Sequence, residues 1–325
     1  MHTDAIFNIS DSTTFNQVAL SVFNHQYQNN AVYREFCNHL KRNPKNVLTV
    51  SEIPFLPIQF FKSHTVKSTA TADEIIFTSS GTTGSITSKH HVPSLALYQE
   101  SYLKGFTHFY GAIEEYCVLA LLPSYLEREG SSLIYMAEDF IKRSNHEQSG
   151  FYLNDLDRLK NTLVELEEKG IKTLLLGVSF ALLDLIEMHN FTLAHTIIME
   201  TGGMKGRRKE MIREELHHTL SQGFGTQKIH SEYGMTELLS QGYSKGDGLF
   251  FTPPWMQISI RDTEDPLQLL TQGKTGGINV IDLANFNSCS FIATQDLGKV
   301  HPNGSFEVLG RFDHSDIRGC NLMVM

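Results

Sequence analysis

The chain has 325 residues, of which 41% are hydrophobic and 19% charged, a balance typical of a globular protein able to bury a substantial core. It carries 27 Lys and Arg against 36 Asp and Glu, which gives a net charge of −9 at pH 7. This acidic balance argues against broad binding to nucleic acid or to an anionic membrane, because both partners need a basic surface.

The N-terminus and the cysteines favour a cytoplasmic protein. The first ten residues lack the basic start and apolar run of a secretory signal. No stretch reaches the roughly 20 apolar residues that a membrane span needs. The cysteines are scattered and form no CxxC pair or His/Cys cluster typical of zinc. We expect free thiols at Cys37, Cys117, Cys289 and Cys320.

The first hundred residues predict helices around an extended segment. Apolar residues at helical spacing predict helix from Ser12 to about Arg42. Pro54 and Pro57 keep the following segment extended. Residues 74–80 are typical of a strand that enters a loop rich in Ser, Thr and Gly, and a further helix is expected over residues 94–109.

Strands and helices then alternate as far as residue 234. Strands are expected at 115–123, 171–177, 194–203 and 227–234, and helices at 131–144, 179–189 and 205–220. Ser131 is a candidate N-cap. Repeated strand–helix units predict an α/β fold with mostly parallel sheets flanked by helices.

After about residue 242 the pattern changes to short strands separated by Gly, Asp and Asn. This predicts a smaller, mainly antiparallel β-subdomain near the C-terminus. We therefore expect a single core over residues 1–325, with an α/β portion at 1–242 and the β-subdomain and C-terminal tail at 243–325.

The segment FTSSGTTGSITSKHH (residues 77–91) is the first candidate site. Its glycines let backbone N–H groups turn toward an anion, its hydroxyls can donate to phosphate oxygens, and Lys89 adds a positive charge. The spacing is not that of a Walker A motif, and a polar surface loop is the alternative. The candidate phosphate ligands are Ser79, Ser80, Gly81, Thr82, Thr83 and Gly84.

Two further stretches carry candidate ligands. YGMTE ends a strand, where open α/β sheets bind ligands, and Glu237 is suited to Mg²⁺. In TQDLG, Asp296 precedes an expected glycine turn and could bond two ribose hydroxyls. Arg311 follows a strand and could reach a ribose or phosphate oxygen. The alternatives are a solvated glutamate and two β-hairpins with a surface arginine.

The stretch GVSFA nearly matches the G-x-S-x-G nucleophile elbow, between a strand and a helix. Ala181 replaces the second glycine, where the elbow needs close backbone approach. A helix N-cap is the simpler interpretation of Ser179, and a serine hydrolase is kept as an alternative.

Taken together, the motifs resemble the adenylate-forming superfamily. TSSGTTGS, TGGMKG, YGMTE, TQDLG and GRFDHSDIRG occur in that family's order, from roughly residue 50 to the end. IPFLPIQFFKSH, SGTTGSITSKHHV, LLPSYLEREGSSLIYM and LLLGVSFALLD look like the LuxE type of acyl-protein synthetase, which is related to phenylacetate-CoA ligases. The resemblance implies the large N-terminal domain of the superfamily.

The resemblance also implies an activity. Such an enzyme uses ATP and Mg²⁺ to convert a carboxylic acid, here expected to be a long-chain fatty acid, into acyl-AMP and pyrophosphate. The acyl group then passes to a cysteine thiol as a thioester, and an acyl-CoA reductase or acyltransferase is the expected protein partner. An acyl- or aryl-CoA ligase and a non-catalytic nucleotide-binding scaffold are the alternatives.

Residue roles follow from the resemblance in the same way. The chain is expected to end where the superfamily's C-terminal domain would begin, so that domain's lysine has no counterpart and Lys89 is the candidate replacement. Cys320 is the expected acyl acceptor and Glu237 the Mg²⁺ ligand. The nucleotide is assigned to residues 79–84, to Gly202 and Gly203 beside the adenine, to Tyr233, Gly234 and Thr236, and to Asp296 and Arg311.

Overall fold

The computed structural model describes residues 4–79, 86–123, 130–202, 208–209 and 211–312. The chain divides into two compact units. Unit 1 takes in residues 1–101, 236–240 and 251–325, and unit 2 takes in residues 102–235 and 241–250. Helices and strands confirm the α/β class. The expected organisation with a boundary after residue 242 stays a prediction.

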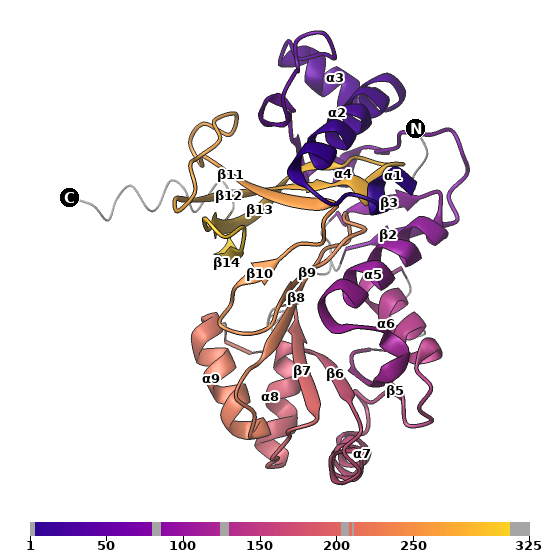
Figure 1. Cartoon of the computed structure of the whole chain (residues 1–325), viewed down its shortest axis with the longest axis vertical. Coiled ribbons are helices and arrows are strands. Elements are labelled where there is room, and N and C mark those ends of the chain that lie inside the picture. The colour runs from indigo at the N-terminus through magenta and orange to yellow at the C-terminus, as the bar shows by residue number, and fades with distance from the viewer. Residues whose placement is uncertain (1–3, 80–85, 124–129, 203–207, 210, 313–325) are drawn as a thin grey trace, which may run out of the picture. The chain divides into compact units, whose positions relative to one another are not determined.

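Unit 2 contains a mostly parallel sheet (Figure 1). Its strands lie in the order β5, β4, β6, β7, β8 and β9, with β9 antiparallel to β8 and the other neighbours parallel. The strands are β4 (Cys117–Leu121), β5 (Gly150–Phe151), β6 (Thr173–Val178), β7 (Thr196–Thr201), β8 (His230–Tyr233) and β9 (Gly242–Ser244), and β10 (Phe250–Phe251) lies next to β9.

The central strands of this sheet are buried along their whole length. Every residue of β4 and β6 is buried. Helices cover both faces of a parallel sheet, so its strands form continuous apolar runs such as TLLLGV. Figure 1 shows α8 and α9 on one face and α6 on the other. The helices are α6 (Ser132–Arg143), α7 (Leu156–Glu168), α8 (Ser179–Met188) and α9 (Arg213–Phe224), with the 3₁₀ turn η2 (Ile113–Glu115) before β4.

Side-chain caps mark the first residue of several helices. Ser131 caps α6, as expected, by accepting from the backbone N–H of Ile134. Asp155 caps α7, a helix that the sequence analysis did not identify. Helix α9 begins at Arg213, later than the expected start at residue 205, and runs on to Phe224.

Unit 1 begins with helices and ends with strands. Asp11 caps α2, and Asn30 both ends α2 and caps α3, so the long predicted helix is two helices joined at one residue. The helices are α1 (Asp4–Phe7), α2 (Ser12–Asn29), α3 (Ala31–His39) and α4 (Phe60–Ser63), with the 3₁₀ turn η1 (Val50–Glu52). Helix α5 (Leu95–Tyr110) begins in unit 1 and continues into unit 2. No helix of the described ranges is both long and apolar enough to cross a membrane.

The C-terminal strands of unit 1 form an antiparallel sheet, as predicted. It contains β11 (Met256–Arg261), β12 (Thr275–Asp282), β13 (Phe291–Val300) and β14 (Phe306–Arg311) in that order, and η3 (Leu283–Asn285) follows β12. Strand β13 has two partners on one side. Its start pairs in parallel with β1 (Leu56–Pro57), and its second half pairs with β14.

A separate hairpin frames the Ser/Thr/Gly loop. β2 (Ile75–Thr78) pairs antiparallel with β3 (Lys89–Val92), and Thr78 lies opposite Lys89. The second strand of this hairpin is not evident from the sequence, because KHHV carries little apolar alternation. The loop is therefore closed at its base by a two-stranded ladder.

A buried glutamine joins α2 to the turn after β12. Gln26 is fully buried, and its amide nitrogen lies 3.1 and 3.0 Å from the carbonyl oxygens of Asn285 and Phe286. Its side-chain oxygen accepts from the backbone N–H of Ser290 at 2.9 Å. These bonds connect residues about 260 positions apart in the sequence.

Gln26→Ala should lower the free energy of unfolding by about 2 kcal/mol or more, because it leaves several buried polar groups without partners. Urea unfolding at pH 7 measures the change. Gln28→Ala, at an exposed position of the same helix, should change it by less than about 0.5 kcal/mol. Equal effects of the two substitutions would contradict a structural role for the Gln26 amide.

Candidate active site

The base of the Ser/Thr/Gly loop is fixed by two serines. The backbone N–H of Ser79 donates to the Ser88 carbonyl at 3.1 Å, and the N–H of Ser88 donates to the Ser79 hydroxyl at 2.9 Å. Residues 80–84, the other predicted phosphate ligands, lie outside the described residues. The hairpin therefore brings the two ends of the candidate phosphate loop together.

Glu237 lies beside this hairpin. It is 5% exposed, and its carboxylate accepts a hydrogen bond from the Ser88 hydroxyl. Burial raises the pKa of Glu237, and the bond from Ser88 and the charges of Arg311 and Lys62 oppose the increase. The predicted Mg²⁺ ligand is thus a desolvated carboxylate at the base of the predicted phosphate loop.

The backbone around Glu237 is held by side chains from other elements. The Thr236 carbonyl lies 2.8 Å from Nδ1 of His90, and the Glu237 carbonyl accepts from the Asn285 amide nitrogen at 2.7 Å. Two residues further on, the Asp282 carboxylate accepts from the N–H of Leu239 at 2.7 Å and of Ser240 at 2.9 Å. Nearly all backbone polar groups in protein interiors need such partners.

His90 contacts two acceptors at once. Its Nδ1 faces the Thr236 carbonyl, and its Nε2 lies 2.9 Å from the side-chain oxygen of Asn285. The amide nitrogen of the same Asn285 side chain donates to the Glu237 carbonyl. Both acceptors favour a doubly protonated ring, but complete burial outweighs them and lowers the pKa of His90 to about 4. Asn285, Asp282 and Ser88 are site residues that the sequence analysis did not assign, because each acts on groups distant in the sequence.

Lys89 lies on the other face of β3. It is exposed, whereas its neighbours Ser88 and His90 are buried. Successive side chains of a strand point to opposite faces, so Lys89 points away from the side that contacts Thr236 and Glu237. Its predicted catalytic role stays a prediction. Lys62, exposed on α4, is instead a lysine whose charge acts on Glu237.

Asp296 and Arg311 form an ion pair. Asp296 is 7% exposed, and Arg311 Nε lies 3.2 Å from its carboxylate across the β13–β14 ladder. The expected glycine turn after Asp296 is wrong, because Asp296 lies inside β13 and the register shifts at Gly298. A Cβ at Gly298 would approach the Glu307 carbonyl oxygen to 2.4 Å, so this glycine permits close strand contact.

In unit 2, the ends of β6, β7 and β8 carry the remaining described site residues. Ser179 is 2% exposed, and its hydroxyl donates to the Gly202 carbonyl at 2.6 Å and to Glu200 at 3.3 Å. Ser179 is the first residue of α8 and not its N-cap, so the capping interpretation is wrong. No histidine is among its hydrogen-bond partners in the described chain, and its position gives the serine hydrolase no support.

Two buried glutamates, Glu200 and Glu232, lie on the neighbouring strands β7 and β8 near these strand ends. Burial alone would raise the pKa of Glu200, but bonds and charges from His217 and Arg213 lower it overall. For Glu232, burial dominates and raises the pKa to about 7, against the bond that the Thr201 hydroxyl donates at 2.6 Å. A Cβ at the predicted nucleotide ligand Gly234 would lie 2.4 Å from the Glu232 carboxylate.

Tyr233 and Gly203 complete the predictions for this region. Tyr233 ends β8 and is 8% exposed, with its ring 6.1 Å from that of Phe250. Gly203 lies outside the described residues, as does Cys320. The remaining cysteines, Cys37, Cys117 and Cys289, are buried free thiols with a raised pKa, as their apolar surroundings predict.

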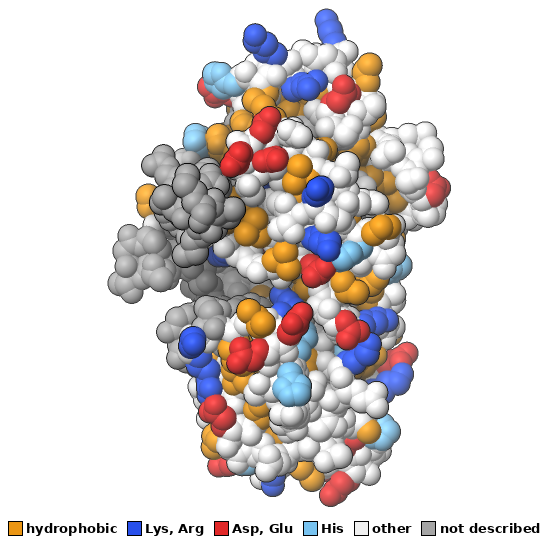
Figure 2. Space-filling model, turned by 90° about the vertical axis from the view of Figure 1, so that its left-hand side faces the viewer, with side chains coloured by type: hydrophobic (Ala, Val, Ile, Leu, Met, Phe, Trp, Pro, Cys, Tyr) orange, Lys and Arg blue, Asp and Glu red, His pale blue; other side chains and the backbone are white. Residues whose placement is uncertain are grey.

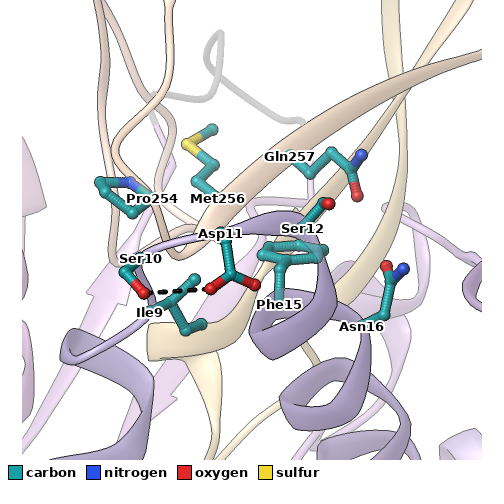
Figure 3. A pocket seen from close by; sticks show the side chains of 9 residues that line it. All are labelled: Ile9, Ser10, Asp11, Ser12, Phe15, Asn16, Pro254, Met256 and Gln257. Atoms are coloured by element: carbon teal, nitrogen blue, oxygen red, sulfur yellow. Dashed lines mark hydrogen bonds between the residues drawn. The ribbon is translucent and has the colours of Figure 1, made fainter.

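Two cavities lie apart from these residues. Figure 3 shows one of about 250 Å³ in unit 1, between the start of α2 and β11, where Ser10 bonds to Asp11. The other, of about 450 Å³, lies at the amino ends of the unit 2 strands and includes Lys172 and Lys228. On the face shown in Figure 2, acidic and basic side chains are interspersed. Among the described residues, no group of three or more His, Cys, Asp and Glu residues could hold a metal ion.

The fold is that of the adenylate-forming enzymes. ATP-bound MatB from Rhodopseudomonas palustris superposes on this chain with a TM-score of 0.54 and 19% sequence identity. The match covers 74% of this chain and 48% of the MatB chain. An ATP-bound RpMatB-BxBclM chimera gives 0.55 and 18% over the same shares. A third structure is an open conformation of 2-hydroxyisobutyryl-CoA ligase in complex with 2-HIB-AMP and CoA. It superposes with a TM-score of 0.65 and 10% sequence identity, over 93% of this chain and 70% of the ligase chain.

The chain spans about half the length of the MatB structures it matches. Residues 6–97 match the family model described as acyl-protein synthetase, LuxE. This match includes α2 and α3, which precede the motifs that indicated the superfamily, and it confirms the LuxE resemblance in that region. A comparison with curated protein sequences gives no match.

Glu232→Gln should alter the pH dependence of stability. Because the folded pKa of about 7 lies above the ordinary 4.5, the stability that Glu232 contributes is fully present below pH 4.5 and is lost as pH rises through 7. The neutral amide avoids this loss. The free energy of unfolding of the variant, relative to that of the wild type, should therefore rise by at least about 1 kcal/mol from pH 5 to pH 8.

Urea unfolding across that pH range tests the expectation. Glu168→Gln, at an exposed position of α7, is the matched control and should follow the wild type at each pH. A difference between Glu232→Gln and the wild type that stays constant with pH would contradict a protonated Glu232.

Proposed function

We propose that this chain activates a carboxylic acid, with a long-chain fatty acid as the expected substrate, to an acyl adenylate in the cytoplasm. The observation that carries the proposal is the buried Glu237 carboxylate, which is bonded to Ser88 at the base of the Ser/Thr/Gly loop. A carboxylate beside a loop of anion-binding composition suits a metal–triphosphate complex. The adenylate-forming fold and the LuxE match over residues 6–97 support it.

Mg²⁺ fits the residues present. Glu237 supplies one buried carboxylate, and Mg²⁺ in nucleotide sites takes one or two carboxylates, with phosphates and water completing its shell. A larger acidic cluster is therefore not required. When bound, Mg²⁺ neutralises charge on the phosphates. The pKa of Glu237 is raised because the cations of the protein, Arg311 and Lys62, only partly offset the burial of this carboxylate.

We assign each part of the nucleotide to residues whose side chains or backbone suit it chemically. The buried Asp296 carboxylate can accept from ribose hydroxyls, and Arg311, with a largely exposed side chain, can turn toward a phosphate or ribose oxygen. Thr236 would donate to the α-phosphate. The phosphates are assigned to residues 79–84, and the adenine side to Gly202, Gly203, Tyr233 and Gly234.

The reaction has two steps. A carboxylate oxygen of the acid attacks the α-phosphorus, the bond to the bridging oxygen of the β-phosphate breaks, and pyrophosphate leaves with the electron pair. The Cys320 thiolate then attacks the acyl carbonyl, the carbon–oxygen bond to AMP breaks, and the thiol proton passes to solvent. An acyl-CoA reductase or acyltransferase would accept the acyl group from this thioester.

Mass spectrometry of the intact protein tests both steps. After incubation with MgATP and mixed fatty acids, the wild type should gain the mass of one fatty acid minus water, and neutral hydroxylamine should remove this added mass. Cys320→Ser should gain no mass and should keep acid-dependent ATP–pyrophosphate exchange. Acylation that persists in Cys320→Ser would exclude Cys320 as the acceptor.

The other activities give different results in the same assay. Acid-dependent formation of acyl-CoA by Cys320→Ser in the presence of CoA would favour a CoA ligase. ATP binding without exchange for any fatty or aryl acid would exclude the ligase and favour a nucleotide-binding scaffold.

Glu237→Gln should reduce pyrophosphate exchange by about 100-fold or more, because it removes the proposed metal ligand charge. The amide can still accept from Ser88, and the loss of a buried carboxylate should leave the melting temperature unchanged or raised. Exchange rates and thermal unfolding measure the two effects. Exchange at the wild-type rate would exclude Glu237 as the ligand.

A further inference from the structure

The segment Thr236–Ser240 has an irregular, largely buried backbone. Its polar groups have no strand or helix ladder to pair with, so side chains from elsewhere in unit 1 supply the partners. On one side this partner is Asp282, which accepts from the N–H groups of Leu239 and Ser240. On the other side, next to the Glu237 carboxylate, the partners are His90 and Asn285.

His90 and Asn285 act on the two carbonyls that flank the Cα of Glu237. His90 Nδ1 lies 2.8 Å from the Thr236 carbonyl, and the Asn285 amide nitrogen donates to the Glu237 carbonyl at 2.7 Å. Two fixed peptide planes determine where the side chain of the residue between them points. His90 Nε2 also lies 2.9 Å from the Asn285 oxygen, which links the pair to each other.

The pair is itself held in place. Both residues are fully buried, and the Phe61 ring lies edge-on to His90 at 5.8 Å between centroids. The side-chain amide of Gln26 donates a hydrogen bond to the Asn285 carbonyl. His90 also lies two residues from Ser88, which donates to the Glu237 carboxylate. Strand β3 and the residue before it therefore contact both the backbone and the side chain of this segment.

We propose that His90 and Asn285 are positioning residues that orient the Glu237 carboxylate toward the divalent metal ion of a metal–nucleotide complex. The inference rests on the proposed function, since it assumes that Glu237 binds this metal. It does not depend on a charge on the histidine: the neutral Nδ1–H tautomer donates to the Thr236 carbonyl, and Asn285 keeps its bond to the Glu237 carbonyl.

Binding of Mn²⁺ in the presence of ATP tests the inference without turnover. The electron paramagnetic resonance signal of free Mn²⁺ decreases as the ion binds, and this decrease measures binding. His90→Leu and Asn285→Ala should each raise the dissociation constant of the Mn²⁺·ATP complex at least tenfold. His90→Asn keeps a side-chain N–H near the Nδ1 position and should recover affinity to within about threefold of the wild type. The Mg²⁺ concentration for half-maximal pyrophosphate exchange should rise in parallel.

A matched control separates positioning from folding. The Ser288 hydroxyl is buried in unit 1 and donates to the Val66 carbonyl at 2.7 Å, away from Glu237. Ser288→Ala should lower the melting temperature while changing Mn²⁺·ATP affinity less than twofold. If Ser288→Ala weakens affinity as much as His90→Leu, or if His90→Leu and Asn285→Ala bind like the wild type, the inference is wrong.

The outcomes also distinguish the inference from the proposed function. A wild type that binds no Mn²⁺·ATP overturns both. A wild type that binds and exchanges pyrophosphate, with variants that do the same, overturns the positioning role alone. If His90→Leu does not fold, Asn285→Ser decides the question, because it removes the amide donor to Glu237 with a smaller change in volume.

Discussion

The irregular backbone of residues 236–240 is the constraint on which unit 1 depends. A buried peptide group without a partner costs free energy comparable to a lost hydrogen bond. Side chains from β3, from the end of β12 and from η3 remove that cost by binding carbonyls and N–H groups of the segment. Gln26 of α2 in turn holds the carbonyl of Asn285. The N-terminal helices and the C-terminal strands are thus joined by polar contacts around one short loop.

Burial has different consequences for three glutamates. Glu200 is kept ionised by Arg213 and His217, so it acts as a structural charge in unit 2. For Glu232 the bond from Thr201 does not offset desolvation, and the charge of Glu200 adds to it, so the neutral form is favoured. Glu237 lies between these cases, because its hydrogen bond and nearby cations offset desolvation only in part. We expect such a carboxylate to gain most from a bound metal ion.

Local patterns predicted the elements well and the site in part. Apolar runs located β4 and β6, Ser131 was recognised as a cap, and the change near residue 242 anticipated the antiparallel strands. The turn after Asp296 was wrong because glycine also permits close strand contact, as at Gly298. Asn285 was not assigned, since its role arises from a contact across 48 positions. Sequence spacing carries no signal for such pairs.

The contacts of α2 have a consequence for synthesis on the ribosome. This helix is made early, but Gln26 and Asn30 find their partners at residues 285–290, about 260 positions later. At roughly 5–20 residues per second, the N-terminal helices wait on the order of ten seconds to a minute before these bonds can form. During that interval their apolar faces, which include Phe15 and Val22, have no sheet to cover them. We expect the nascent chain to be a chaperone client until β13 has emerged.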